Sequence, residues 1–185
     1  SLTNVTFRGN TADFVGGGGS LFVPPPYALT VNGGLFENNR AADPTSSIGG
    51  GLAIYGTFSL TGTQFRANTA GQGGGLTHQE VIDSGTGRIV NALFASNSAA
   101  TGNGAALSLN SPFSVDVLYT TIVSPALAST SAVYVVAGTV GITNTLVASH
   151  TLGINNAGGT VRENYNLFSG VTTPYSGALI NGGNS

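Results

Sequence analysis

The sequence predicts an all-β protein, a single right-handed parallel β-helix over residues 1–185 with about six to seven coils of three short strands each. Three observations lead to this fold class. A Phe-x-x-Asn motif recurs every 29 residues in the first half of the chain, as in repeat architectures. Short apolar clusters of strand length alternate with Gly, Asn, Ser and Pro. With 29 glycines and no helical spacing of apolar residues, almost no helix is expected.

The Phe-x-x-Asn motif marks the register of the early coils. Each copy supplies an aromatic and an asparagine: Phe7 and Asn10, Phe36 and Asn39, Phe65 and Asn68, Phe94 and Asn97. We expect the rings to stack inside the rod, where burial of each contributes roughly 2 to 3 kcal/mol. We expect the asparagines at the bend after the strand, bonded to one another and to turn backbone, with left-handed dihedral angles tolerated. A row of ligand-binding asparagines is the alternative, and the structural ladder is preferred.

Three strand columns follow when the periods are aligned. The first strand leads into the motif and continues after the motif is lost, at residues 121–123 and 145–147. The second strand follows a cluster of glycines or small residues and starts at Leu21, Leu52, Leu76, Leu107 and Val133. The third covers residues 29–31, 58–60, 89–90, 113–115 and 140–142. The spacing shortens along the chain while the strand order persists, which indicates shorter loops on the same solenoid.

The glycine clusters at residues 16–19, 49–51 and 73–75 invite comparison with phosphate-binding loops. Such a loop needs Lys followed by Ser or Thr at the start of a helix, and these clusters have neither. The position of these glycines, at the corner before the second strand, better explains why they are needed. Glycine there permits positive φ and lets successive coils approach closely.

Loops between the strands are expected to protrude at residues 24–26, which are three prolines, at 41–47, and at 77–88. The last of these carries the one triplet of charged side chains worth testing as a site: Glu80, Asp83 and Arg88. Carboxylates and a guanidinium on one loop have the chemistry to bind Ca²⁺ or a sugar. A solvated loop without a ligand is the preferred interpretation.

Composition excludes several classes of partner. The net charge is −2 and all five basic residues are arginines, so we expect no nucleic acid partner. The chain has no cysteine, hence no disulfide or thiolate metal site. No apolar run reaches the roughly 18 residues of a membrane helix, so no membrane span is expected in this segment. The first residues lie in mid-repeat, which indicates a segment excised from a longer repeat protein.

The motif residues also carry a family resemblance. Phe36-Glu37-Asn38-Asn39 followed by Gly49-Gly50-Gly51-Leu52 resembles the repeat of polymorphic outer membrane proteins. Residues 144–149 and 163–169 are similar to the end of the β-helical region in bacterial choice-of-anchor surface proteins. The resemblance implies the right-handed β-helix of the pectate-lyase-like superfamily and a place outside the cell or on a bacterial surface. Such proteins include adhesins, passengers and carbohydrate-active enzymes alike.

Enzymatic chemistry finds little support in the residues. Glycoside hydrolysis needs two carboxylates about 5 to 9 Å apart, and uronate elimination needs an acidic metal cluster with a basic residue. The seven acids occur singly, and there is no lysine. His78 and His150 fall more than two coils apart in the alignment, so each is expected to be a surface or packing histidine. We therefore expect no catalytic residues, no metal and no cofactor.

The predicted function is a non-catalytic extracellular scaffold or adhesin module of a bacterial surface or filament protein. A carbohydrate-active enzyme fragment or a glycan-binding module is the alternative. An ice-binding solenoid is a remote third, because the column before the motif reads Thr6, Leu35, Gln64, Leu93, Thr121 and Thr145, too broken for a threonine array. Expected partners are a cell-surface glycan or protein, and a second copy joined end to end through open β-helix ends.

Overall fold

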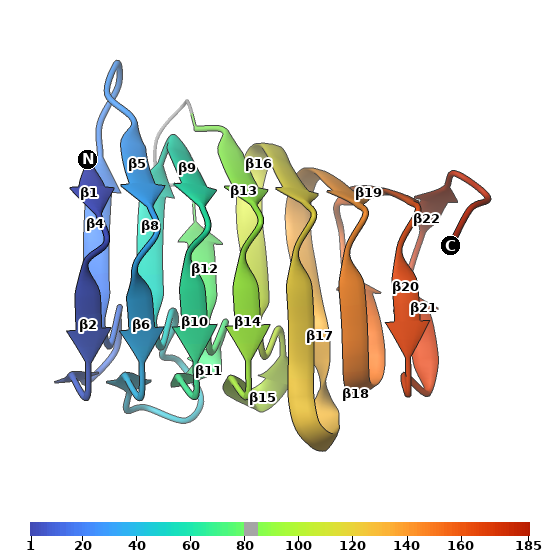
Figure 1. Cartoon of the computed structure of the whole chain (residues 1–185), viewed down its shortest axis with the longest axis horizontal. Helices are drawn as coiled ribbons and strands as arrows, with labels where there is room; N and C mark the ends of the chain where they lie inside the picture. The colour runs from blue at the N-terminus through green and yellow to red at the C-terminus, as the bar shows by residue number, and fades with distance from the viewer. Residues whose placement is uncertain (80–84) are drawn as a thin grey trace.

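The computed structural model describes residues 1–79 and 85–185, which wind into a right-handed parallel β-helix (Figure 1). Strands on the near face of the rod run in one direction, and strands on the far face return in the other (Figure 1). Every pairing between strands is parallel and joins one coil to the next, and the described residues contain no helix. In this part of the chain there is accordingly no helix able to cross a membrane.

Three strand columns form each coil. The motif column contains β2 (Thr6–Arg8), β6 (Leu35–Glu37), β10 (Gln64–Arg66), β14 (Leu93–Ala95), the first residues of β17 (Thr121–Thr143) and of β18 (Leu146–Asn156), and β20 (Leu167–Ser169). The glycine column contains β4 (Gly19–Val23), β8 (Leu52–Gly56), β12 (Leu76–Gln79), the first part of β16 (Leu107–Leu118), later residues of β17 and β18, and β21 (Thr173–Ser176).

The third column contains β1 (Leu2–Thr3), β5 (Leu29–Asn32), β9 (Phe58–Thr61), β13 (Gly87–Val90), the last parts of β16 and β17, β19 (Thr160–Asn164) and β22 (Leu179–Asn181). A separate four-stranded side sheet contains β3 (Thr11–Ala12), β7 (Arg40–Ala41), β11 (Thr69–Gln72) and β15 (Ser98–Asn103). The all-β parallel solenoid is thus confirmed, with a fourth strand in the early coils that the sequence did not predict.

The interior of the rod is built from the inward positions of these columns. In the motif column Phe7, Phe36, Phe65 and Phe94 pair in register and are followed by Ile122, Val147 and Phe168. Most of these side chains belong to one continuous hydrophobic cluster. Because alternate residues of a strand face opposite sides, the flanking positions point outward, and in the motif column they include Arg8, Glu37 and Arg66.

Three alignments made from sequence are wrong. Leu21 pairs with Ile54 rather than Leu52, and Val115, not Phe113, pairs with Val140. Both errors are shifts of two residues, which keep every side chain on its own face, so the apolar pattern does not detect them. In the motif column Leu146, not the neighbouring Thr145, pairs with Thr121. The outward column therefore contains one threonine fewer than expected, which weakens the ice-binding alternative further.

The loop at residues 41–47 is held by one carboxylate. Asp43 Oδ1 accepts hydrogen bonds from the backbone N–H groups of Thr45 and Ser46, at 2.9 and 2.8 Å, and from the Thr45 hydroxyl at 2.9 Å. The Ser46 and Thr45 backbone donors hold the pKa of Asp43 well below its usual range. The expected loop at 77–88 is shorter than predicted, because residues 77–79 belong to β12 and 87–88 to β13.

The glycine clusters have both properties that the sequence indicated. Gly49 has φ +65° at the corner before β8. At Gly50 a Cβ atom would lie 2.4 Å from the Thr69 carbonyl oxygen and 2.5 Å from that of Gly74, which leaves no room for a side chain. The obstacle at Thr69 belongs to the side sheet of the following coil, so the fourth strand contributes to the glycine requirement together with the next glycine cluster at Gly74.

Candidate functional site

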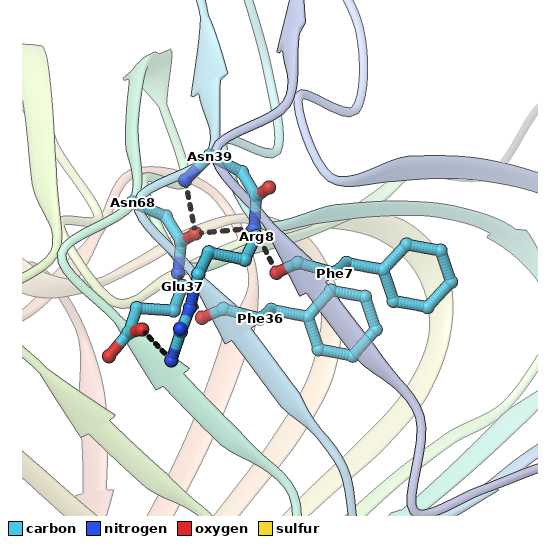
Figure 2. A network of polar contacts seen from close by, with 6 residues as sticks. All are labelled: Phe7, Arg8, Phe36, Glu37, Asn39 and Asn68. Carbon is cyan, nitrogen blue, oxygen red and sulfur yellow. Dashed lines mark hydrogen bonds and ion pairs between the residues drawn. The ribbon is translucent and has the colours of Figure 1, made fainter.

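The motif asparagines form a hydrogen-bonded ladder along the rod (Figure 2). The Asn39 amide nitrogen donates to the Phe7 carbonyl oxygen at 2.9 Å and to Asn68 Oδ1 at 3.0 Å. The backbone N–H of Asn39 donates to the same Asn68 Oδ1, also at 3.0 Å. Each amide therefore joins its own coil to the coils before and after it.

The same geometry repeats on either side of Asn39. Asn68 donates to the Phe36 carbonyl at 2.8 Å and to Asn97 Oδ1 at 3.0 Å, and Asn97 donates to the Phe65 carbonyl at 2.9 Å. Asn10 starts the ladder with a 2.9 Å bond to Asn39 Oδ1. Asn39, Asn68 and Asn97 are buried, so these amides are not available to a ligand.

The ladder asparagines differ from expectation in one respect. The left-handed residue of each bend is the one before the asparagine, with φ between 50° and 66°, and it is in turn Gly9, Asn38, Ala67 and Ser96. The ladder asparagines themselves have ordinary backbone angles, and their contribution is the side-chain amide alone.

A stack of phenylalanine rings runs beside the ladder. Successive rings of Phe7, Phe36, Phe65 and Phe94 lie 4.9, 4.9 and 4.8 Å apart, with interplanar angles of 9°, 11° and 3°. In Figure 2 the carbonyl oxygens of Phe7 and Phe36 lie at the asparagine amides, and their two parallel rings point away from the amides and from the Arg8–Glu37 pair. Arg8 and Glu37 form an ion pair at 2.7 Å whose arginine is largely exposed, which adds little stability.

Both histidines are buried packing residues on different columns. His78 lies in the glycine column between Ile54 and Leu109, with Nε2 3.1 Å from the Gly56 carbonyl oxygen and the ring edge against Phe58. Burial lowers the pKa of His78 to about 4, despite the Gly56 contact.

His150 occupies the ladder position of a later coil, three residues after Val147. Its burial lowers its pKa, an effect that the nearby Thr130 backbone partly offsets. Neither ring nitrogen of His150 has a contact of hydrogen-bond geometry within the described residues. The two histidines lie on β12 and β18, which do not pair, so they do not form a joint site.

The described residues do not place the charged triplet Glu80, Asp83 and Arg88 together on one loop. Glu80 and Asp83 lie outside the described residues. Arg88 belongs to strand β13 and not to a loop, where it is exposed and pairs in register with Ser59 and Asp116. Its guanidinium therefore belongs to the flat outer face of the third column.

The structure reveals one buried acid that sequence reasoning missed. Glu163 is 2% exposed and pairs with Ile142 at an inward position of the third column. Its Oε2 accepts hydrogen bonds from the Asn166 amide, at 2.9 Å, and from the Ser185 hydroxyl. Burial and the Glu163 charge raise the pKa of Tyr175 to about 12. The signal was present in the sequence, because Val161 and Glu163 alternate with outward residues, but single acids are almost always assigned to the surface.

These acids do not form a metal centre. Among the residues described by the structure, no three His, Asp or Glu side chains gather closely enough to hold a metal ion. Glu163 accepts hydrogen bonds at Oε2 from Asn166 and Ser185, whereas its buried Oε1 has no hydrogen-bond partner among the described residues. Asp43 accepts hydrogen bonds within its own loop. The arrangement provides an anchored carboxylate and a ladder of amides, both of which stabilise the coils.

Comparisons with protein-family models, with curated proteins and with solved structures found no match to this chain. The resemblance to polymorphic outer membrane protein repeats and choice-of-anchor surface proteins therefore stays a prediction.

Proposed function

We propose that the chain is a non-catalytic structural module, a β-helical rod of an extracellular bacterial surface or filament protein that displays its outer faces and loops for adhesion. The observation that carries the proposal is the commitment of polar and aromatic side chains to contacts between coils. The ladder amides and the stacked rings join four successive coils, and the buried histidines and Glu163 also face the interior. Such a rod gains stability from every interface between neighbours.

The alternative function, cleavage of a polysaccharide, would have to depend on Glu163. Its buried carboxylate is the strongest candidate for an acid or base among the described residues. We expect no cleavage when the purified chain is incubated with polygalacturonate or with neutral β-glucans and the products are separated by chromatography. Product formation that disappears in Glu163→Gln would overturn the non-catalytic proposal. Asp13→Asn, which removes an exposed carboxylate, is the matched control.

End-to-end association is part of the same proposal. Strands β2 and β20 each pair with one neighbour in the described structure, so their outer edges present unpaired backbone groups. We expect the 185-residue chain to sediment as concentration-dependent oligomers. A strictly monomeric chain at high concentration would contradict filament building and leave the display role standing.

A further inference from the structure

The turn between the third column and the motif column contains a left-handed residue in every coil. Backbone hydrogen bonds place these residues directly above one another: Tyr119 N–H donates to the Thr143 carbonyl at 3.1 Å, and Asn144 N–H to the Asn164 carbonyl at 3.2 Å. Their φ values lie between 50° and 67°, and the column reads Asn4, Gly33, Gly62, Asn91, Tyr119, Asn144 and Tyr165. We call these seven residues the turn column.

Two residues in the turn column do not suit its conformation. Glycine and asparagine adopt left-handed angles readily, whereas a bulky aromatic residue does so rarely and at a cost. Tyr119 and Tyr165 nevertheless occupy the column with φ of 51° and 54°, and they are 59% and 58% exposed. Packing does not explain side chains that are mostly in solvent, and backbone strain of this kind is characteristic of functional positions.

The two tyrosines are regularly spaced. They lie two coils apart, about 9.6 Å along the rod, with the exposed Asn144 between them. Tyr119 lies between β16 and β17 and Tyr165 between β19 and β20, where the third column leads into the motif column. Two aromatic side chains with an amide between them, on a rigid sheet, form a platform for an extended ligand.

A hollow in the outer sheet borders this platform. Its volume is about 240 Å³, and its lining includes Gly141, Thr143, Arg162, Asn164 and Ile180. Thr143 and Asn164 directly precede Asn144 and Tyr165, so the hollow and the turn column are continuous. The volume is smaller than the roughly 300 to 1,000 Å³ of a drug-sized site, which suits one sugar-sized unit.

The charges around the hollow favour a neutral ligand. Asp116 and Arg162 flank Gly141 in neighbouring coils of the third column. A Cβ atom at Gly141 would lie 2.8 Å from Asp116 Oδ1, so this carboxylate lies beside one of the residues that line the hollow. Glu163, a second acid, belongs to the lining itself. An anionic ligand would gain from Arg162 but would be repelled by Asp116. A neutral polyhydroxyl ligand can donate to the carboxylate, accept from the guanidinium, and place its C–H faces on the tyrosine rings and on Ile180.

We propose that Tyr119, Asn144 and Tyr165, with the hollow at Gly141, bind an extended neutral β-linked oligosaccharide. The site deepens the display role proposed above and rests on it. Tyr119 and Tyr165 stack on sugars separated by one intervening residue of the glycan. Arg162, Asp116 and Asn164 hydrogen-bond to the hydroxyl groups of the sugar that occupies the hollow.

The test uses calorimetric titration of the whole chain with cellohexaose, xylohexaose and mannohexaose, and with hexagalacturonate as the anionic probe. We expect at least one neutral hexamer to bind with Kd at or below about 1 mM, more tightly than its disaccharide and than hexagalacturonate. Absence of binding by all three neutral hexamers would overturn the site. Tighter binding of hexagalacturonate would overturn the neutral assignment.

Variants separate the site from the fold. Tyr119→Asn and Tyr165→Asn install the residue natural to the turn column, so we expect each to raise the Tm by about 2–4 °C while weakening binding about tenfold or more. Tyr27→Asn, which removes a 69% exposed loop tyrosine, is the control and leaves binding unchanged. Unchanged binding in both turn-column variants would overturn the proposal.

The fate of the bound hexamer tests the proposed function separately. Intact hexamer after incubation is expected from a non-catalytic module. Cleavage would contradict the non-catalytic function while leaving the site supported by its variants, and failure of all hexamers to bind would remove the site while leaving the rod.

Discussion

Substitution of Asn68 by alanine tests whether the ladder stabilises the early coils. Asn68 Oδ1 accepts from the backbone N–H and the amide of Asn39, and its own amide donates to the Phe36 carbonyl and to Asn97 Oδ1. Asn68→Ala therefore leaves three groups of its neighbours without this partner inside the rod: the Asn39 backbone N–H, one amide hydrogen of Asn39 and the Phe36 carbonyl. Asn97 Oδ1 keeps its hydrogen bond from the backbone N–H of residue 68, at 3.0 Å. A buried group left unsatisfied costs about 1 to 3 kcal/mol, and partial relaxation is expected, so we predict a loss of about 3–5 kcal/mol.

The chain supplies a matched control for Asn68→Ala at the start of the ladder. Asn10 is exposed, and after Asn10→Ala the Asn39 Oδ1 atom keeps its hydrogen bond from the Asn10 backbone N–H at 3.0 Å. The expected loss is below about 1 kcal/mol. The measurement is the free energy of unfolding from equilibrium urea titrations followed by circular dichroism.

Asn68→Asp separates hydrogen bonding from packing. Aspartate has the shape of asparagine and keeps both acceptor contacts, but it has no amide donors and places a buried charge beside two oxygen atoms. We expect Asn68→Asp to destabilise the chain at neutral pH at least as much as Asn68→Ala. Equal losses at Asn10 and Asn68, or a wild-type stability for Asn68→Asp, would refute the ladder as the source of stability.

Three further predictions follow from the interior. Phe65→Ala should cost about 3–5 kcal/mol and lower the Tm more than Tyr27→Ala in an exposed loop; equal Tm values would contradict the stacking. Because burial lowers the pKa of His78 from 6.5 to about 4, the neutral form is favoured in the fold. The stability should therefore be fully present above pH 6.5 and be lost between pH 6.5 and 4, by on the order of 3 kcal/mol. Urea titrations at both ends of this range should show a smaller loss for His78→Leu. Gly50→Ala should prevent folding or sharply lower the Tm in thermal unfolding, since its Cβ has no room, whereas Ala105→Gly at a buried position should cost only about 1 kcal/mol.

The sequence predicted the repeat better than the details of each coil. Phe65 and Asn68 sit at a fixed period with a distinctive chemistry, so their register followed directly. Leu21 was misplaced by two residues because alternation constrains only the face of the strand and not the step along it.

The candidate site was less predictable than the fold. Tyr165 reads as an ordinary aromatic residue until its coil position shows that it occupies a left-handed turn. Glu163 reads as a surface acid until its register places it beside Ile142 in the core. Both assignments need the stacking of coils whose spacing falls to 21 residues and whose motif is no longer present.

The side sheet explains why the motif is lost where it is. Each ladder asparagine is followed directly by a side-sheet strand, and the last described one, β15, starts after Asn97. At the next ladder positions stand Pro125 and His150, which carry no side-chain amide.

The glycine clusters end at the same coil. Gly74 has no room for a Cβ because the Ser98 carbonyl carbon and oxygen lie 2.7 and 2.2 Å away, and Ser98 begins β15. Ala105 occupies the equivalent position one coil later, where its backbone N–H bonds to Ser131 and no side-sheet strand follows in the described chain. The asparagine, the glycine and the 29-residue period are thus one structural device, required only as long as each coil carries a fourth strand.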